Sequence, residues 1–222
     1  MAKQWAWSFS KLNNYETCAY RHQQVDLLKN FQDGDGEALV WGNQVHDAMK
    51  QALTGTAPLP ASMEYYQRWV DLVRAGPGEL LVEQKYAIAK DFTKTAYFAP
   101  NVWYRGIADV VRIHGDIALA LDWKTGRVKE NSVQLALMAQ CIFAHYPAVH
   151  HVRSEFIWLQ EDCTTPEIYS RSDMANLWIA LLPRVEKMET AALTKQYPPK
   201  PGGLCVKYCP VKSCQFWGKG DR

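Results

Sequence analysis

Two acidic residues and a lysine in the middle of the chain have the types and spacing for phosphodiester chemistry. Asp122 and Lys124 are two residues apart on the segment 117–124, which alternates like a strand, so both side chains should project from one face. Asp109 lies on the preceding strand, and a turn at 114–116 would bring it near Asp122. Paired carboxylates can hold a divalent cation that polarises a phosphate, and a lysine can stabilise developing charge. Taken alone, Asp-x-Lys is common, and a surface salt bridge is the simpler interpretation.

Hydrophobic periodicity predicts the elements that must position these residues. The expected helices are one capped by Ser8 or Ser10, and others at about 39–53, 61–75, 132–145 and 172–195; the expected strands are 80–89, 102–113, 117–124 and 152–159. The tail from 197 to 222 is rich in Pro, Gly and Cys and has no periodicity. This order predicts an α/β fold whose helical N-terminus and cysteine tail meet.

Length and composition agree with one globular domain. The 222 residues are 48% hydrophobic and 22% charged, which excludes a disordered chain. We expect a single domain over 1–222, with a helical part (1–78), a catalytic sheet and helix (79–160) and a C-terminal helix and tail (161–222). No apolar run approaches the ~20 residues that cross a bilayer, and the start lacks a signal peptide. We therefore expect a soluble cytoplasmic protein with no membrane partner. The net charge of +2 does not demand nucleic acid but permits a local basic groove.

The cysteines are unevenly distributed. Cys205, Cys209 and Cys214 lie within ten residues of one another, and Cys18 lies near the other end of the chain. Clustered cysteines in an intracellular protein more often bind metal or do redox chemistry than form disulfides. Four thiolates can ligate an iron–sulfur cluster or a zinc ion, and the alternative is free buried thiols. Cys141 and Cys163 are interpreted as core residues without a role.

Several motifs occur in an order that carries more information than any of them alone. In chain order they are Ser10-x-Leu12-x-x-Tyr15-x-x-Cys18, Gly42-x-x-x-His46, Gly106-x-x-Asp109, Asp122-x-Lys124-Thr125-Gly126, Gln134 and the tail cysteines. Together they resemble the PD-(D/E)XK nuclease superfamily, and more narrowly its RecB-like branch with the AddB-like and CRISPR-associated iron–sulfur exonucleases. The resemblance implies a restriction-endonuclease-like core, a mixed central sheet flanked by helices, with the tail tied to the N-terminal helix.

The resemblance also implies roles for individual residues. His46, Asp109 and Asp122 would hold Mg²⁺ or Mn²⁺, and an imidazole ligand favours Mn²⁺ more than an all-oxygen site does. Lys124 would help to activate water, and Gln134 would support it. The family often has a tyrosine one turn after this glutamine, where the present chain has methionine.

Glu83 is a candidate supporting acid. It lies on the first expected strand, where some nucleases of this type carry an acidic residue. A solvent-facing strand carboxylate is the alternative.

The resemblance further implies that Cys18, Cys205, Cys209 and Cys214 hold a [4Fe–4S] cluster, with zinc as the alternative. The spacing is C-x3-C-x4-C, whereas the usual pattern is C-x2-C-x5-C, so only the middle cysteine has moved.

Basic residues near the expected site are candidates for contacts with the DNA backbone, which supplies much of the affinity of nucleic-acid-binding proteins. They are Arg21, Arg105, Arg127 and Lys129. Aromatic residues could stack on unpaired bases, although strand aromatics are usually core. The aromatic candidates are Tyr20, Trp103, Tyr104 and Trp123.

The expected function is that of a metal-dependent DNA nuclease, most simply an exonuclease on single-stranded DNA or DNA ends. It would act in recombination, repair, phage DNA metabolism or CRISPR adaptation, with recombination, replication or CRISPR-adaptation proteins as partners, in a bacterial or phage-infected cell. The chain has no Walker motif and so no helicase of its own. Two alternatives remain: a structure-specific endonuclease, and a non-catalytic DNA-binding module organised by iron–sulfur or zinc.

Overall fold

The computed structural model describes residues 5–32, 36–129 and 132–219, which fall into two compact units. The sheet unit comprises residues 36–178 together with 5 and 6. The terminal unit combines residues 7–32 from one end of the chain with 179–219 from the other. The longest helix passes from one unit into the other. That the whole chain acts as one nuclease domain stays a prediction.

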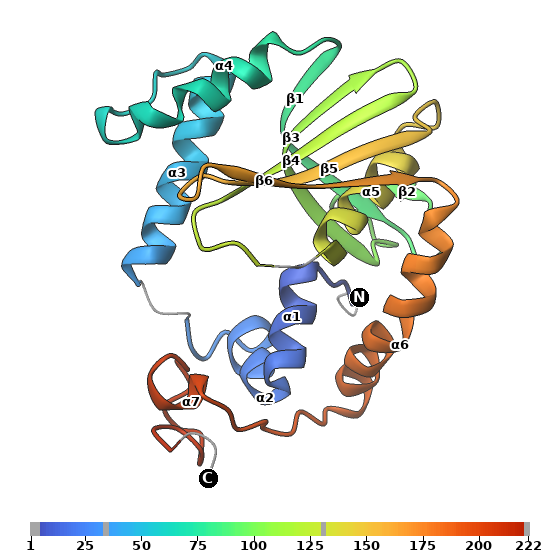
Figure 1. The fold of residues 1–222 in the computed structure, drawn as a ribbon. Helices are drawn as coiled ribbons and strands as arrows, with labels where there is room; N and C mark the ends of the chain where they lie inside the picture. Colours follow the sequence, from blue (N-terminus) through green and yellow to red (C-terminus); the bar gives the residue numbers. More distant parts are fainter. Residues whose placement is uncertain (1–4, 33–35, 130–131, 220–222) are drawn as a thin grey trace. The chain divides into compact units, whose positions relative to one another are not determined.

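The sheet unit contains most of the regular structure (Figure 1). Its elements are α3 (Glu37–Thr54), a 3₁₀ helix (Ala61–Tyr66), α4 (Gln67–Ala75), β1 (Glu79–Ile88), β2 (Lys94–Thr95), β3 (Tyr104–His114), β4 (Ile117–Lys124), α5 (Ser132–His145), β5 (His151–Trp158), β6 (Cys163–Ser170) and the start of α6 (Asp173–Thr194). The expected helix at 61–75 is therefore 3₁₀ over its first six residues.

The described strands form one mixed sheet in the order β2-β1-β3-β4-β5-β6. All neighbours are antiparallel except β4 and β5, which are parallel and joined through α5, as a parallel pair requires a crossover. The predicted mixed sheet with flanking helices is confirmed. Two strands were not predicted from the sequence. The segment Cys163–Ser170 is exposed along most of its length and contains Pro166, so it lacks the apolar alternation that marks a strand and is tolerated only at an edge.

β4 stops pairing with β3 before it stops pairing with β5, so the sheet separates between β3 and β4. β3 and β4 pair from His114–Ile117 as far as Val110–Leu121, and their pairing ends there. β4 continues to pair with β5 through Lys124. The next residues beyond the last β3–β4 pair are Asp109 and Asp122, so the two carboxylates lie where the strands separate.

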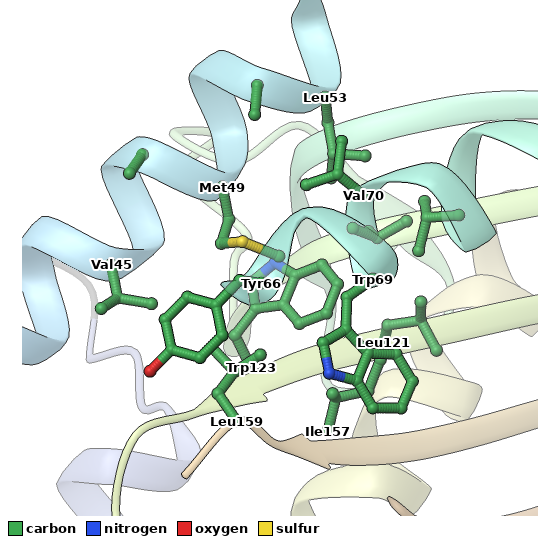
Figure 2. Close-up of a cluster of buried hydrophobic side chains, with 14 of the residues drawn as sticks. Val45, Met49, Leu53, Tyr66, Trp69, Val70, Leu121, Trp123, Ile157 and Leu159 are labelled. Atoms are coloured by element: carbon green, nitrogen blue, oxygen red, sulfur yellow. The ribbon is translucent and has the colours of Figure 1, made fainter. Parts of the chain in front are cut away.

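A hydrophobic cluster holds α3 and α4 on the sheet (Figure 2). Val45, Met49 and Leu53 recur at helical spacing along α3, and Val45 and Met49 are fully buried. They pack with strand residues such as Leu121 and Trp123. Burying large side chains of this kind stabilises a protein by roughly 1.5–3 kcal/mol each. The core thus fixes α3, which carries His46, against the strands that carry the carboxylates.

Three of the aromatic candidates are buried. Trp103, Tyr104 and Trp123 are only 4%, 3% and 2% exposed. The prediction that these three residues stack on bases is therefore wrong, because other parts of the protein cover their rings.

The terminal unit packs the two ends of the chain together. Its elements are α1 (Phe9–Thr17), α2 (Ala19–His22), a π-helical turn (Gln23–Leu27), the rest of α6, and α7 (Leu204–Lys207). Arg184 on α6 donates two hydrogen bonds of 2.7 Å to the Glu16 carboxylate. The Tyr15 hydroxyl donates to the Lys187 carbonyl at 3.1 Å. The predicted link between the N-terminal helix and the C-terminal segment is therefore present.

Among residues 5–32, 36–129 and 132–219, no helix combines the length and the apolar character needed to cross a bilayer.

Candidate active site

Asp109 is anchored where β3 and β4 separate. Its Oδ2 accepts a 2.8 Å hydrogen bond from the backbone N–H of Trp123, which replaces the strand pairing lost at this point. Its Oδ1 lies 3.1 Å from His46 Nδ1 on α3. Asp109 is only 8% exposed and lies between a strand backbone and a helix side chain.

A close approach of α3 brings His46 to this carboxylate. Gly42 precedes His46 by one helical turn, and a Cβ at position 42 would stand 3.3 Å from Thr125 Oγ1. Burial disfavours the charged imidazole, but the hydrogen bond and charge of Asp109 outweigh it and raise the pKa of His46. Within this motif, Gly42 lets α3 pack closely against Thr125, and His46 makes a polar contact with Asp109.

Glu83 faces the same group from β1. It lies opposite Asp109, between the pairs Val82–Val110 and Gln84–Ala108. Its φ of 54° is left-handed, a conformation that is strained for a non-glycine residue and that clusters at functional sites. Burial, then the nearby Asp109 charge, raises the pKa of Glu83. Its left-handed backbone and its place beside Asp109 distinguish Glu83 from an ordinary strand carboxylate that faces solvent.

Asp122, Lys124 and Gln134 form a second, contiguous network. Lys124 Nζ lies 2.5 Å from Asp122 Oδ2 and donates to Gln134 Oε1 at 3.1 Å. Gln134 Nε2 donates to Asp122 Oδ1 at 2.6 Å. Burial raises the pKa of Asp122 to about 6, with Lys124 opposing and Asp109 adding to the rise. These three residues, predicted together from the sequence, are brought together.

The donor atoms fit a divalent cation. One atom each from His46, Glu83 and Asp109 lie within 4.8 Å of one another, and carboxylate oxygen and imidazole nitrogen suit Mg²⁺ or Mn²⁺. The buried Asp122 Oδ2 has no well-formed hydrogen bond to any described residue, only its close ion pair with Lys124. The structure thus adds Glu83 to the expected ligands, and it ties Asp122 mainly to Lys124 and Gln134. The ligand roles themselves stay predictions.

The basic candidates have different surroundings. Arg105 lies over the rings of Tyr97 and Phe98, at 5.3 and 5.6 Å from their centroids. Arg127 and Lys129 are exposed on the segment after β4. Their contacts with DNA stay predictions.

Within the terminal unit, the four predicted cysteines line a single pocket of about 310 Å³. Cys18 separates α1 from α2 and has an extended backbone conformation. Cys205, Cys209 and Cys214 come from the tail, and Arg21 lines the same pocket. Burial raises the pKa of the Cys209 thiol, with Cys205 and Cys18 adding to the rise. Thiols that are distant in sequence therefore line one pocket, and their role as ligands stays a prediction.

Two solved structures are similar to this chain over most of its length. A "putative exonuclease" from Eubacterium rectale superposes with a TM-score of 0.56 at 9% identity, covering 95% of this chain and 86% of that one. The solved protein SSO0001 is similar at a TM-score of 0.49 and 13% identity, covering 98% and 89%. No curated protein matches the sequence. The PD-(D/E)XK nuclease superfamily model matches residues 6–214, which include every residue of the site described above. The chain belongs to the PD-(D/E)XK nuclease superfamily.

Proposed function

We propose that the protein is a metal-dependent DNA exonuclease that hydrolyses phosphodiester bonds in single-stranded DNA or at DNA ends. One observation carries the proposal: the His46, Glu83 and Asp109 donors lie within 4.8 Å of one another, next to a lysine held by a carboxylate and an amide. A structural salt bridge would not require three further ligand atoms beside it. The solved "putative exonuclease" with a similar fold supports the exonuclease assignment as a proposal.

The protein's own groups divide the chemical work. His46, Glu83, Asp109 and, through its Oδ2, Asp122 are the residues that would hold Mg²⁺ or Mn²⁺. A bound cation would supply Lewis-acid polarisation of the phosphate. Lys124 stabilises the charge that grows on the phosphate oxygens as water attacks phosphorus in line and the P–O bond to the leaving group breaks. Asp122 and Gln134 hold the Lys124 ammonium for that task.

We further propose that Cys18, Cys205, Cys209 and Cys214, which line the pocket in the terminal unit, hold a [4Fe–4S] cluster. All four cysteines line this one pocket of about 310 Å³. Four thiolates can ligate a [4Fe–4S] cluster, and zinc is the alternative that metal analysis of the purified protein distinguishes.

The test is digestion of end-labelled single-stranded DNA with Mn²⁺, comparing wild type with Asp122→Ala. We expect degradation by the wild type and none by the variant. Circular single-stranded DNA should survive, because an exonuclease needs an end. Degradation of the circle would instead indicate an endonuclease, and inactivity of the wild type on both substrates would overturn the proposal. The biological process, whether recombination, repair, phage DNA metabolism or CRISPR adaptation, stays a prediction.

A further inference from the structure

The sheet unit has an open cavity of about 770 Å³, and some residues that line it are neighbours in sequence of the candidate active-site residues. One wall is Thr125 and Gly126, which directly follow Lys124. Another wall is the first turns of α3, including Trp41, which lies five residues before His46. A polymer whose phosphate lies beside Lys124 would therefore pass this cavity with its neighbouring nucleotide.

The third wall is aromatic. Tyr65 is 61% exposed, whereas Tyr66 beneath it is 3% exposed and belongs to the hydrophobic core (Figure 2). The two rings have centroids 4.1 Å apart, and the Tyr65 hydroxyl donates to the Tyr66 hydroxyl at 3.1 Å. An exposed ring is thus braced from below by a buried one. Core packing explains Tyr66 but not the exposed face of Tyr65.

The remaining lining suits a base rather than a phosphate. Leu39, which is 50% exposed, adds apolar surface, and Thr125 and Gln160 add hydrogen-bonding groups. Among the residues that the structure describes, no Lys or Arg lines the cavity, while Arg127 lies exposed just past Gly126. Apolar and aromatic walls, with a cation outside them, fit a flat base inside and its phosphate at the edge.

We propose that this cavity, named here the Tyr65 pocket, receives one unpaired base of the DNA strand whose phosphodiester bond lies at the candidate active site. The inference rests on the proposed function and names its substrate class as single-stranded DNA. A base inside a duplex is stacked on both faces and cannot present one to Tyr65. Because every base has a π-face, the pocket selects strandedness rather than sequence.

The test is a binding measurement without metal, so that no strand is cut. Fluorescence anisotropy in EDTA follows three labelled probes of equal length: oligothymidylate, a fully abasic strand, and a duplex. The abasic strand carries the same phosphates but no bases. The variants are Tyr65→Ala, Tyr65→Phe, which keeps the ring, and the matched control Tyr208→Ala, which removes a tyrosine that is 75% exposed outside the pocket.

Wild type should bind oligothymidylate more tightly than the abasic strand. Tyr65→Ala should weaken oligothymidylate binding by roughly 5- to 100-fold and remove that preference, as expected for one lost stacking platform. Tyr65→Phe and Tyr208→Ala should keep the preference, and duplex affinity should be equal in all four proteins. An unchanged preference in Tyr65→Ala, or an equal loss in Tyr208→Ala, overturns the proposal.

Nuclease assays separate this failure from a failure of the proposed function. If the wild type cuts DNA but Tyr65→Ala keeps the base preference, the pocket assignment is wrong and the nuclease assignment stands. If the wild type cuts neither linear nor circular DNA while the base preference depends on Tyr65, the protein is a single-strand-binding module and the nuclease assignment is wrong.

Discussion

Gln134 and Asp122 are joined by a 2.6 Å hydrogen bond from the amide nitrogen Nε2 on α5 to the carboxylate oxygen Oδ1 on β4. The other end of the same amide accepts a hydrogen bond from Lys124. One neutral group therefore satisfies an anion and a cation at once, which is possible only for a side chain with both a donor and an acceptor. Gln134 is accordingly a positioning residue for the lysine.

Gln134→Ala should lower kcat by about tenfold and change KM little, because losing a hydrogen bond to a charged group costs about 1.5 kcal/mol. Steady-state digestion of single-stranded DNA measures both constants. Gln134→Glu is the matched variant, since it keeps the size but places a second carboxylate against Asp122. It should be slower than Gln134→Ala. If both variants turn over like the wild type, the amide has no positioning role.

Lys124→Met should lower turnover by about 100-fold, the usual cost of removing one group that stabilises transition-state charge. DNA affinity in EDTA should change little, because one phosphate contact among several contributes a small part of binding. Lys129→Met is the control: it removes an exposed lysine on the segment after β4 and should slightly weaken binding without slowing turnover. Equal losses of turnover in the two variants would remove Lys124 from its assigned role.

Glu83→Gln should raise the Mn²⁺ concentration needed for half-maximal activity by about tenfold, because an amide is a weaker ligand than a carboxylate. Asp47→Asn is the control, since Asp47 is the exposed acidic neighbour of His46. Isothermal calorimetry with Mn²⁺ should show the same order of affinities. If the Mn²⁺ concentration needed for half-maximal activity rises in Asp47→Asn but not in Glu83→Gln, Glu83 does not belong to the metal-binding group.

The left-handed backbone of Glu83 shows why the sequence predicted this site only in part. Motif order placed His46, Asp109, Asp122 and Lys124 correctly on elements that meet. The φ of 54° at Glu83 has no signal in the residue type, because a strand carboxylate looks the same with either backbone. Its place beside Asp109 depends on β1–β3 register, which local patterns do not encode.

The aromatic residues show the opposite error. Trp103 and Trp123 lie close in sequence to the catalytic motifs, but both side chains are buried in the core. Tyr65 lies far from those motifs in sequence. It belongs to a 3₁₀ helix in which the next residue, Tyr66, is buried. Only the packing of that helix against the sheet brings Tyr65 to the segment after Lys124. Proximity in sequence was therefore a poor guide to proximity at the site.

Cys209→Ala should lower the melting temperature by more than about 5 °C, because binding of a cluster contributes directly to folding free energy. The visible absorption and iron content of the purified protein should fall in parallel. Cys163→Ala is the control, since Cys163 is not the core residue expected from the sequence but an exposed thiol on β6. Zinc in place of iron in the wild type would contradict the cluster assignment, and equal melting temperatures would contradict its role in stability.

Asp26 provides a pH-dependent test of the terminal unit that is independent of either metal. Its Oδ2 accepts hydrogen bonds from His22 at 2.8 Å and Asn14 at 3.0 Å. Burial alone would raise the pKa of Asp26, but these hydrogen bonds and the His22 charge outweigh it and hold the pKa below its usual value. The carboxylate therefore stabilises the fold above its ordinary pKa of about 4, and this contribution is lost as the pH falls through the lower, folded value.

Asp26→Asn should accordingly melt at a lower temperature than the wild type near about pH 7, by an amount equivalent to about 1–2 kcal/mol, and the difference should narrow below about pH 4. Melting curves across this range measure it. Asp71→Asn, which alters an exposed helix carboxylate, is the control and should change the melting temperature little. If the Asp26→Asn difference instead widens on acidification, the carboxylate is not the stabilising form, and the His22–Asp26–Asn14 contact contributes through packing alone.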